Sequence, residues 1–337
     1  MINNKTILIT GGTGSFGKKF VDIISKKYKP KKIIIYSRDE QKQFQLQQKW
    51  RGNKFSNIRY FIGDVRDLDR LKLAMQEVNI VIHAAALKHI PIAEYNPFEV
   101  VKTNVLGAQN VIDASFYNKV EKVIALSTDK ASSPINLYGA TKLASDKLFV
   151  AANNYRGGSK IKFSVVRYGN VMGSRGSLIP FFLKKKDEGA FPVTDRKMTR
   201  FNITLSEGVD FVLLALKTMS GGEIFVPKIP SYRVIDVAKA ISSKTKIKII
   251  GIRPGEKLHE EMISRSDASN AVEFSKYFVI IPNSDFINLN KKKYIQMHKE
   301  SKSCKNEFFY NSENNKLFLS ISDIKKLIIN NSKDFEL

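Results

Sequence analysis

A tyrosine and a lysine four residues apart form the pair whose types and spacing most clearly suit proton transfer. They are Tyr138 and Lys142, and on a helix this spacing places both side chains on one face. A free tyrosine titrates near about 10, and a neighbouring ammonium lowers that pKa by stabilising the phenolate. We therefore predict that Tyr138 acts as a base towards a substrate hydroxyl.

A second group of polar side chains lies just upstream of this pair. Ser127-Thr128-Asp129-Lys130 ends the β-branched run Lys122–Ser127, which has the composition of a buried strand. Open α/β sheets bind their ligands at the carboxyl ends of their strands. The sequence therefore places this group in the same candidate site as Tyr138.

Three glycines near the start of the chain mark a candidate phosphate-binding loop. Gly11, Gly14 and Gly17 follow the predicted strand Thr6–Thr10, and a helix begins among them. Glycine permits a tight turn and close backbone approach, while the helix N-terminus presents free N–H groups to a pyrophosphate. An ordinary strand-to-helix turn is the alternative, but the βαβ context favours dinucleotide binding.

The end of the second predicted strand indicates which dinucleotide is bound. An acidic residue there holds the ribose 2′-hydroxyl of NAD, whereas an arginine accommodates the 2′-phosphate of NADP. Here Ser37 ends the strand, and Arg38 and Lys42 follow it. A guanidinium can bind phosphate in a bidentate manner, so NADP is favoured. The nearby Asp39 and Glu40 keep open the alternative that the basic residues are only surface charges.

The elements that must position these groups alternate along the first half of the chain. Short β-branched runs alternate with longer amphipathic segments, which is typical of a doubly wound parallel sheet. The predicted strands are Thr6–Thr10, Lys32–Ser37, Ile58–Ile62, Ile80–Ala84, Lys122–Ser127 and Lys162–Val166. The predicted helices are near Gly14–Lys26, Asp67–Met75, Asn96–Tyr117 and Leu137–Asn153. We therefore expect an α/β protein with a Rossmann domain over residues 1–170.

The remainder of the chain, residues 171–337, lacks this regular alternation. Glycine, proline and aromatic residues interrupt it, as expected for a smaller, mainly substrate-binding region with excursions of the chain back to the sheet. The polar stretch Asn283–Asn315 is predicted to form surface loops, and Ser322–Ile329 a last helix.

Several motifs together resemble one known family. The chain is similar to the sugar-nucleotide branch of the extended short-chain dehydrogenase/reductases, in which retaining 4,6-dehydratases carry Ser-Thr-Asp-Glu where this chain has Ser-Thr-Asp-Lys. Lys130 in place of that glutamate resembles the inverting UDP-N-acetylglucosamine 4,6-dehydratases that begin pseudaminic-acid synthesis. The same resemblance extends to His83-Ala84-Ala85-Ala86-Leu87-Lys88-His89, Arg167-Tyr168-Gly169-Asn170-Val171, Gly173-Ser174-Arg175-Gly176-Ser177, Met198-Thr199-Arg200-Phe201 and Arg253-Pro254-Gly255-Glu256-Lys257.

The resemblance implies roles for individual residues. The catalytic residues would be Thr128, Asp129, Lys130 and Tyr138. The resemblance and the glycine loop together place a larger set of residues at the cofactor. These are Gly11, Thr13, Gly14, Ser15, Phe16, Gly17, Ser37, Arg38, Asp39, Glu40, Lys42, Asp64, Val65, Ala84, Lys88, Asn104, Tyr138, Lys142, Val171 and Arg175. The UDP-sugar would be held by Lys88, Asn170, Leu178, Thr194, Arg253 and Glu256. An internal ion pair that caps a turn is the alternative for Arg253 and Glu256.

The implied reaction involves no net redox change. Tyr138 assists oxidation at C4, Lys130 removes the C5 proton, and Asp129 protonates the departing C6 hydroxyl, with inversion at C5. The lysine must be neutral for this role, and its reference pKa is about 10.4. We therefore expect burial and nearby positive charge to lower the pKa of Lys130.

Other functions remain open at this point. A UDP-hexose 4-epimerase would use Tyr138 and Lys142 but would not need the Asp129-Lys130 pair. A capsule-type dehydratase that also epimerises C5 is closer, although known members lack the tyrosine. A non-catalytic NADP-sensing protein would have no reason to keep all four residues together.

Composition narrows the class of protein further. The 337 residues carry a formal net charge of +24, but the basic residues are dispersed, which does not favour nucleic-acid binding as the main function. The single cysteine, Cys304, excludes an intramolecular disulfide, and the spacing around His83 and His89 predicts no metal site. We expect a cytoplasmic protein without a signal peptide or membrane segment; a homo-oligomer and a role in flagellin or surface glycan modification are implied only by the resemblance.

Overall fold

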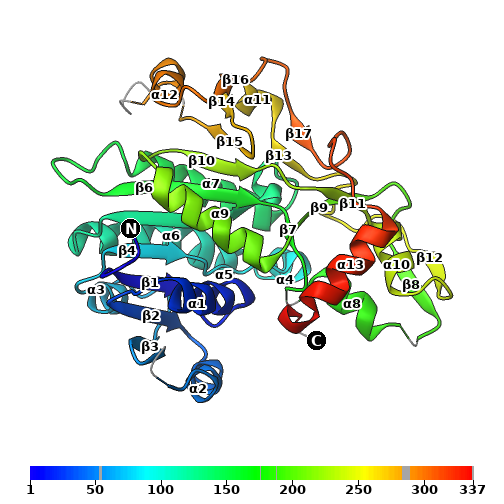
Figure 1. Cartoon of the computed structure of the whole chain (residues 1–337), viewed down its shortest axis with the longest axis horizontal. Helices are drawn as coiled ribbons and strands as arrows, with labels where there is room; N and C mark the ends of the chain where they lie inside the picture. The colour runs from blue at the N-terminus through cyan, green and yellow to red at the C-terminus, as the bar shows by residue number, and fades with distance from the viewer. Residues whose placement is uncertain (53–54, 175, 187, 283–288, 336–337) are drawn as a thin grey trace.

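The centre of the molecule is a large, mostly parallel sheet. The computed structural model describes residues 1–52, 55–174, 176–186, 188–282 and 289–335. Within these residues the main sheet has ten strands in the order β16-β14-β15-β10-β6-β5-β4-β1-β2-β3 (Figure 1). The strands from β10 to β3 in this row are parallel, whereas β15, β14 and β16 extend the sheet antiparallel. The predicted doubly wound α/β class is confirmed.

Strands β1 to β6 of this sheet agree with the predicted ones to within two residues at each end, whereas β10, β14, β15 and β16 were not predicted. Their bounds are β1 Thr6–Thr10, β2 Lys32–Ser37, β3 Ile58–Ile62, β4 Ile80–His83, β5 Lys122–Thr128, β6 Lys162–Tyr168, β10 Ile224–Pro227, β14 Ala271–Glu273, β15 Tyr277–Ile280 and β16 Lys302–Ser303. All residues of β1 and β4 are buried. Continuous apolar runs of this kind are typical of parallel strands that are covered on both faces.

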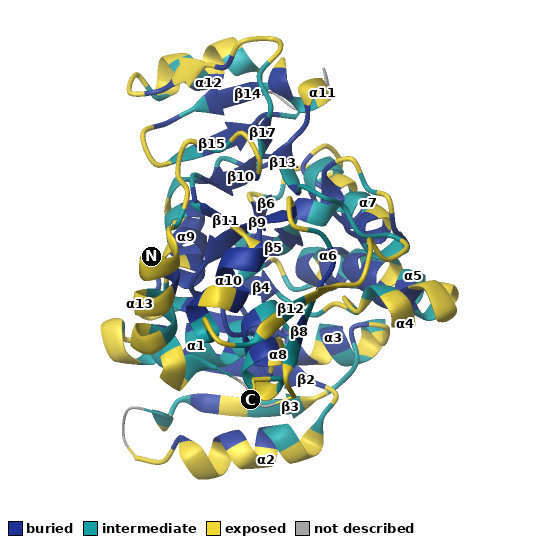
Figure 2. Cartoon of the chain, turned by 90° about the vertical axis from the view of Figure 1, so that its right-hand side faces the viewer, coloured by how far each residue is buried: buried dark blue, intermediate teal, exposed yellow. Residues whose placement is uncertain are grey.

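Helices cover the two faces of the sheet. Helices α1 (Ser15–Lys27) and α9 (Leu205–Thr218) pack together on one face, and α3 (Leu68–Ala74), α6 (Gly107–Tyr117) and α7 (Leu137–Ala151) on the other (Figure 1). Figure 2 shows that most strands of the sheet are buried, whereas the edge strand β3 is partly exposed.

The predicted helix Asn96–Tyr117 is not uniform. Helix α5 (Pro97–Val101) passes through a π-helical turn at Lys102–Leu106 into α6. In this turn the buried Asn104 side chain accepts a hydrogen bond from Leu87 N at 2.9 Å and donates to Leu87 O at 2.9 Å. Such turns are frequent at functional sites, and this one fastens the chain that follows β4.

Helix α2 (Glu40–Lys49) and the short helix α4 (Ile90–Tyr95) were not predicted. Helix α2 is rich in glutamine and has little apolar periodicity, so its helical pattern is weak. Its clearest mark is the side chain of Asp39, which caps the helix by accepting from Lys42 N at 2.9 Å.

A second, smaller core lies beside the sheet. Buried residues such as Phe182, Phe191, Val237 and Ile324 form it, separately from the core around the main sheet. Strands β7 Asn170–Val171 and β9 Thr199–Ile203 pack against the main core. Around the second core lie β8 Ala190–Val193, β11 Ser231–Arg233, β12 Lys246–Ile249, α8 Leu178–Lys184, α10 Val234–Ile241 and α13 Ile321–Asn331. The last of these confirms the predicted final helix.

The prediction that Asn283–Asn315 consists of surface loops is wrong in part. Residues 283–288 lie outside the described residues, but Lys291–Met297 forms helix α12. Strand β16 joins the main sheet, and β17 (Tyr310–Asn311) pairs with β13 (Glu261–Ile263). Short strands in a Lys- and Asn-rich sequence are recognisable only through their pairing with apolar strands elsewhere. The boundary near residue 170 stays a prediction.

In the described part of the chain, no helix is both long enough and apolar enough to span a bilayer.

The glycine loop joins β1 to α1 through a close backbone contact that can be tested. A Cβ at Gly17 would lie 2.5 Å from Gly12 Cα, and this backbone cannot yield. We expect Gly17→Ala to lower the free energy of unfolding by about 1–3 kcal/mol, measured by urea unfolding. Gly208→Ala in α9 is the control, since a Cβ there meets nothing within 4 Å and alanine favours a helix. Equal unfolding midpoints for Gly17→Ala and the wild type would contradict this packing argument.

Candidate active site

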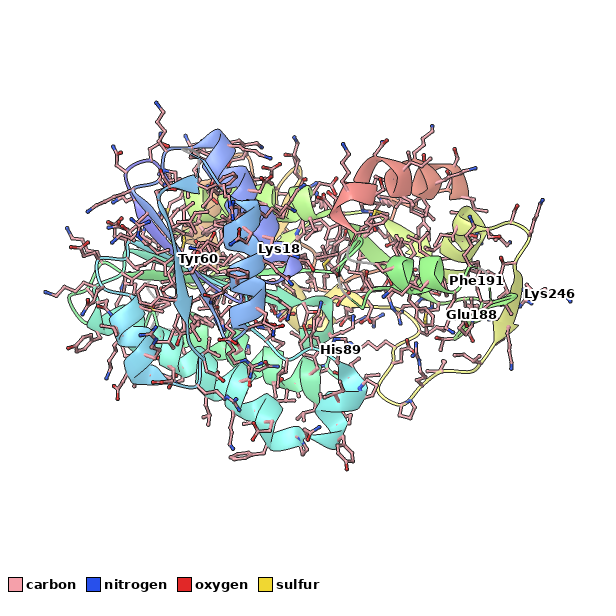
Figure 3. The ribbon with its side chains drawn as sticks, turned by 90° about the horizontal axis from the view of Figure 1, so that it is seen from below. Lys18, Tyr60, His89, Glu188, Phe191 and Lys246 are labelled. Atoms are coloured by element: carbon pink, nitrogen blue, oxygen red, sulfur yellow. The ribbon has the colours of Figure 1, made fainter. Side chains whose placement is uncertain are left out.

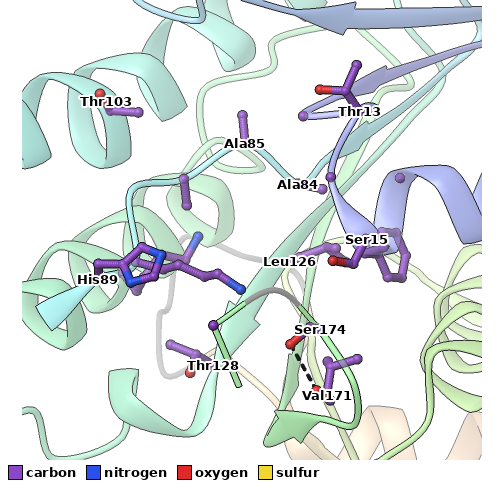
Figure 4. A pocket seen from close by; sticks show the side chains of 18 of the residues that line it. Thr13, Ser15, Ala84, Ala85, His89, Thr103, Leu126, Thr128, Val171 and Ser174 are labelled. Carbon is purple, nitrogen blue, oxygen red and sulfur yellow. Dashed lines mark hydrogen bonds between the residues drawn. The ribbon is translucent and has the colours of Figure 1, made fainter. Parts of the chain in front are cut away.

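One cavity of about 840 Å³ lies at the carboxyl ends of β1, β2, β4 and β5. Figure 3 shows His89, one of its wall residues, between the part of the chain that carries Lys18 and Tyr60 and the part that carries Phe191 and Lys246. Figure 4 shows segments distant in sequence, represented by Thr13, Ala84, Thr128 and Ser174, facing the same space. A site at this edge of the sheet is where the topology of an open α/β fold places it.

Most of the predicted site residues line this cavity. They are Gly11, Thr13, Gly14, Ser15, Phe16, Gly17, Ser37, Arg38, Asp39, Lys42, Asp64, Val65, Ala84, Lys88, Thr128, Asp129, Lys130, Tyr138, Lys142, Asn170 and Val171. Glu40 is exposed on α2 beside a separate hollow, and Asn104 is buried away from the wall, where it holds Leu87. Arg175 lies outside the described residues.

The glycine loop brings the start of α1 close to the ends of β1 and β4. Gly11 has a φ of 66°, and a Cβ there would lie 2.9 Å from Ala85 N. Thr13 Oγ1 and Ser37 Oγ are 2.7 Å apart, so the loop is tied to the end of β2. This geometry leaves the N-terminus of α1 open towards the cavity, where it can receive an anionic group.

The basic residues at the end of β2 differ in their environments. The Arg38 side chain is 52% exposed, and its Nη1 lies 3.5 Å from Asp64 Oδ2. Asp64 is held more tightly by Arg66, whose Nη2 is 2.9 Å from the same oxygen. Asp39 caps α2 and forms an ion pair with Lys42. Asp39, the acidic residue that follows β2, therefore already has partners in α2, namely the backbone N–H and the side chain of Lys42.

Tyr138 and Lys142 lie on one face of α7 and both reach the cavity. Burial raises the pKa of Tyr138 to about 12, against the opposing effects of the Lys130 charge and a hydrogen bond with Thr128. Burial also lowers the pKa of Lys142, against the attraction of Asp146. The expectation that a lysine neighbour lowers the tyrosine pKa is therefore wrong for the protein alone, because desolvation outweighs it.

Lys130 occupies a position that the sequence did not indicate. Its Nζ lies 3.0 Å from Asp129 Oδ1 and 3.0 Å from Glu260 Oε1. Burial alone would lower the pKa of Lys130, but these two carboxylates raise it above its ordinary value. The expected lowering is therefore wrong, because the nearest charged groups are negative rather than positive. Burial raises the pKa of Asp129, against the attraction of Lys130.

The four predicted substrate residues beyond Asn170 lie apart from the cavity wall. Leu178 begins α8, and Thr194 is buried after β8. Arg253 Nε lies 3.3 Å from Glu256 Oε2, and Glu256 N donates to Arg253 O at 3.1 Å. The alternative of a turn with an internal ion pair is thus present in the structure. A ligand that binds Arg253 or Glu256 would have to compete with this ion pair.

Several residues at or behind the wall were not predicted as site residues. Tyr168, Ser174 and Ser177 line the cavity, and Glu260 and Arg200 stand behind Lys130. The motifs contain Arg200 but carry no sign that it contacts Glu260, because the two residues are brought together only by tertiary folding.

Unpartnered polar atoms around the cavity fit a bound polar ligand. Asp129 Oδ2, Asn170 Oδ1 and Ser177 Oγ are buried and have no hydrogen-bond partner within the described protein. Buried polar atoms are rarely left without partners, so a ligand with hydroxyl groups suits this wall. The described residues contain no cluster of His, Cys, Asp and Glu side chains suited to a metal ion.

Known proteins resemble this chain over most of its length. The profile of a family described as "Polysaccharide biosynthesis protein" matches residues 7–282. A Campylobacter jejuni relative named UDP-N-acetylglucosamine 4,6-dehydratase (inverting) is 55% identical, covering 99% of this chain and 100% of the relative. A Rickettsia bellii relative named UDP-glucose 4-epimerase is 42% identical, covering 98% of this chain and 97% of the relative.

Solved structures share the fold. The X-ray structure of Pen from Bacillus thuringiensis has a TM-score of 0.89 and 38% identity, covering 98% of this chain and 99% of that one. DesIV, a dTDP-glucose 4,6-dehydratase from Streptomyces venezuelae solved with NAD bound, has a TM-score of 0.67 and 20% identity, covering 75% of this chain and 86% of that one. The chain belongs to the polysaccharide biosynthesis protein family, which has the fold of the extended short-chain dehydrogenase/reductases.

Proposed function

We propose that this chain dehydrates UDP-N-acetylglucosamine with inversion at C5, using NADP. The product would be UDP-2-acetamido-2,6-dideoxy-L-arabino-4-hexulose. The observation that carries the proposal is that Tyr138, Asp129 and Lys130 meet on the wall of the cavity that also contains the glycine loop. The similarity in sequence to the Campylobacter enzyme supports the same reaction.

The wall fits a dinucleotide in chemistry as well as in position. The loop from Gly11 to Gly17 would hold the pyrophosphate at the N-terminus of α1, and Lys142 the nicotinamide ribose. Asp64 and Val65, at the end of β3, would flank the adenine. Bound NADP would supply the hydride chemistry, by accepting hydride from C4 and returning it to C6.

The choice of NADP rests on the groups at the end of β2. Arg38 is half exposed and only weakly paired, so its guanidinium can turn to a 2′-phosphate. Asp39, which in an NAD site would accept from the ribose 2′-hydroxyl, is already committed to Lys42 and the cap of α2. Ser37 adds a hydroxyl at the same point.

Lys130 and Asp129 can perform the elimination without a change in total charge. Transfer of one proton from Lys130 Nζ to Asp129 Oδ1, across their 3.0 Å contact, gives an amine and a carboxylic acid. The amine then removes the C5 proton, and the acid gives its proton to the departing C6 hydroxyl, which leaves as water. The ion pair is thereby restored. Burial favours such a neutral form relative to two charges, which offsets the high basicity of the lysine.

Tyr138 starts this sequence by taking the proton of the C4 hydroxyl. The Lys130 charge lowers the cost of forming its phenolate, and Thr128 contributes a hydrogen bond. The ketone formed at C4 acidifies the C5–H bond that Lys130 attacks. Inversion requires that C5 regains its proton on the opposite face of the sugar.

The substrate would be held mainly by the region 171–337. Lys88 and Asn170 line the cavity, while Leu178, Thr194, Arg253 and Glu256 would contact the UDP part once the turn at 253–256 opens. We further propose a cytoplasmic homo-oligomer that catalyses the first step of pseudaminic-acid synthesis, for flagellin or surface glycans.

A 4-epimerase is the strongest competing function, because relatives such as the Rickettsia bellii protein carry that name. Such a reaction needs Tyr138 but no acid and base at C6 and C5. The buried contact between Lys130 and Asp129 therefore favours dehydration. A capsule-type dehydratase that epimerises C5 and a non-enzymatic NADP sensor remain less favoured, because Tyr138 and Lys130 both line the cavity.

The cofactor proposal predicts a measurable preference. By calorimetry, NADP+ should bind more tightly than NAD+, and Arg38→Ala should weaken NADP+ binding by about 1.5–3 kcal/mol, as expected for losing a hydrogen bond to a charged group. The Arg38→Ala variant should change NAD+ binding little. Lys49→Ala removes one positive charge from the exposed part of α2 and serves as the control. Equal affinity of the wild type for both cofactors would rule the preference out.

The reaction is tested by incubating the protein with UDP-N-acetylglucosamine in D2O and following the products by NMR. A new C6 methyl signal, deuterium at C5 and inverted configuration at C5 are expected. Lys130→Met should abolish both dehydration and C5 exchange but retain NADP+ binding, whereas Tyr138→Phe should slow the first hydride transfer. A product changed only at C4 would indicate an epimerase. Inverted product formed by Lys130→Met at nearly the wild-type rate would leave Lys130 with a structural role only.

A further inference from the structure

Glu260 is a buried carboxylate that meets Lys130 from outside the cavity. We propose that Glu260 is a positioning residue for Lys130: it fixes the amine within the site and stabilises the ammonium that forms when Lys130 takes the C5 proton. This inference rests on the proposed dehydration. Glu260 is absent from the cavity wall, so it acts through Lys130 and not on the substrate.

The backbone of Glu260 is held rigidly in place. Its N–H donates to Ser312 Oγ at 2.9 Å, and its carbonyl accepts from Ser312 N at 2.8 Å. Ser312 Oγ also lies 2.7 Å from Thr199 Oγ1, within a fully buried network. The Glu260 residue itself is only 2% exposed. A carboxylate fixed to this extent can impose one position on the flexible chain of a lysine.

The contact with Lys130 leaves part of the carboxylate unused. Glu260 Oε1 lies 3.0 Å from Lys130 Nζ and 3.7 Å from Arg200 Nε. Glu260 Oε2 is buried and has no hydrogen-bond partner within the described protein. Because a buried carboxylate without compensation is costly, its presence here depends on Lys130 and Arg200. Burial opposes ionisation, but the charges of Lys130 and Arg200 hold the pKa of Glu260 below its ordinary value.

Several other ionisable groups face this pair. Asp129 contacts Lys130 from its other side, and Arg200 is fixed by donating to Thr199 O at 2.7 Å and Leu258 O at 3.1 Å. The ionisable groups that interact electrostatically with the pair are Asp129, Tyr138, Arg200, Tyr232 and Lys257. Asp129 is the one carboxylate among these groups, and it gives up its proton as the acid of the elimination. Glu260 is therefore the carboxylate next to Lys130 that can remain charged throughout the reaction.

The chemical consequence concerns basicity. When Lys130 has given its proton to Asp129, the amine must recover a proton from C5. A negative charge 3.0 Å from Nζ stabilises the ammonium both in the resting ion pair and after this step. The loss of rate expected without Glu260 therefore comes from the loss of a fixed position for the amine, and the loss of its charge appears in the pH profile. Glu260 neither gains nor loses a proton in this step. The proton leaves C5, arrives on Nζ, and the C5–H electron pair moves towards the C4 ketone.

The test compares Glu260→Gln with Glu273→Gln. Glu273 also forms an ion pair with a lysine, Lys228 at 2.7 Å, but lies on β14 away from the cavity. In Glu260→Gln, kcat and the rate of C5 exchange in D2O should fall by roughly tenfold to a hundredfold, with little change in KM. Glu273→Gln should react like the wild type. Glu260→Asp keeps the charge and should recover part of the lost rate.

The pH profile separates this role from simple structural support. In the active form, Lys130 and Asp129 together hold one exchangeable proton, and the profile falls when the pair gains a second proton or loses the first. The negative charge of Glu260 favours both protonation steps, so its removal lowers the pKa of each. Both limbs of the kcat profile should therefore move to lower pH in Glu260→Gln but stay near the wild-type positions in Glu260→Asp. A uniform loss of rate with unmoved limbs would overturn the proposal.

A measurement independent of activity completes the test. The protein is labelled with ε-¹³C-lysine, and the Lys130 signal is assigned by its absence in Lys130→Met. As the pH is raised, this signal should keep the chemical shift of an ammonium to a higher pH in the wild type than in Glu260→Gln. Identical titration in both proteins would overturn the proposal. If the wild type makes no 4-keto product while the signal shifts as expected, the proposed function fails and the role of Glu260 towards Lys130 stands.

Discussion

The structure depends on the burial of charged groups that must satisfy one another. Lys130, at the end of β5, contacts Asp129 and Glu260 at 3.0 Å each, and the two carboxylates are 1% and 2% exposed. Removing Lys130 would leave two buried carboxylates without the cation that they share, which is destabilising. Because Glu260 precedes β13 and Asp129 follows β5, this requirement joins the second half of the chain to the first.

The backbone around this cluster is correspondingly tight. A Cβ at Gly139 would lie 2.2 Å from Lys130 O, and a Cβ at Gly169 would lie 2.4 Å from Phe201 Cβ and 3.3 Å from Asp129 Oδ2. Glycine at both positions lets the start of α7 and the end of β6 approach the reactive groups. The cluster therefore restricts the residues that can surround it, even where they take no part in chemistry.

Burial acts in opposite directions on neighbouring groups. It raises the pKa of Tyr138 to about 12 and lowers that of Lys142, because in each case desolvation disfavours the charged form. It would also lower the pKa of Lys130, but there two carboxylates prevail. The motif specifies only the residue types, whereas their protonation states depend on which charged groups the fold brings within about 4 Å.

The sequence by itself determined the α/β class, the parallel strands from β1 to β6 and the glycine loop and Tyr138–Lys142 pair of the cavity wall, while the family resemblance supplied most of the other wall residues. These features depend on local patterns: β-branched runs, glycines at fixed spacing, and a tyrosine and lysine on one helical face. Only the tertiary structure placed Glu260 beside Lys130, split the helix at Lys102–Leu106, and paired β16 with β14. Lys130 and Glu260 are 130 positions apart, so their contact produces no local pattern in the sequence. Only the folded chain brings the two residues together.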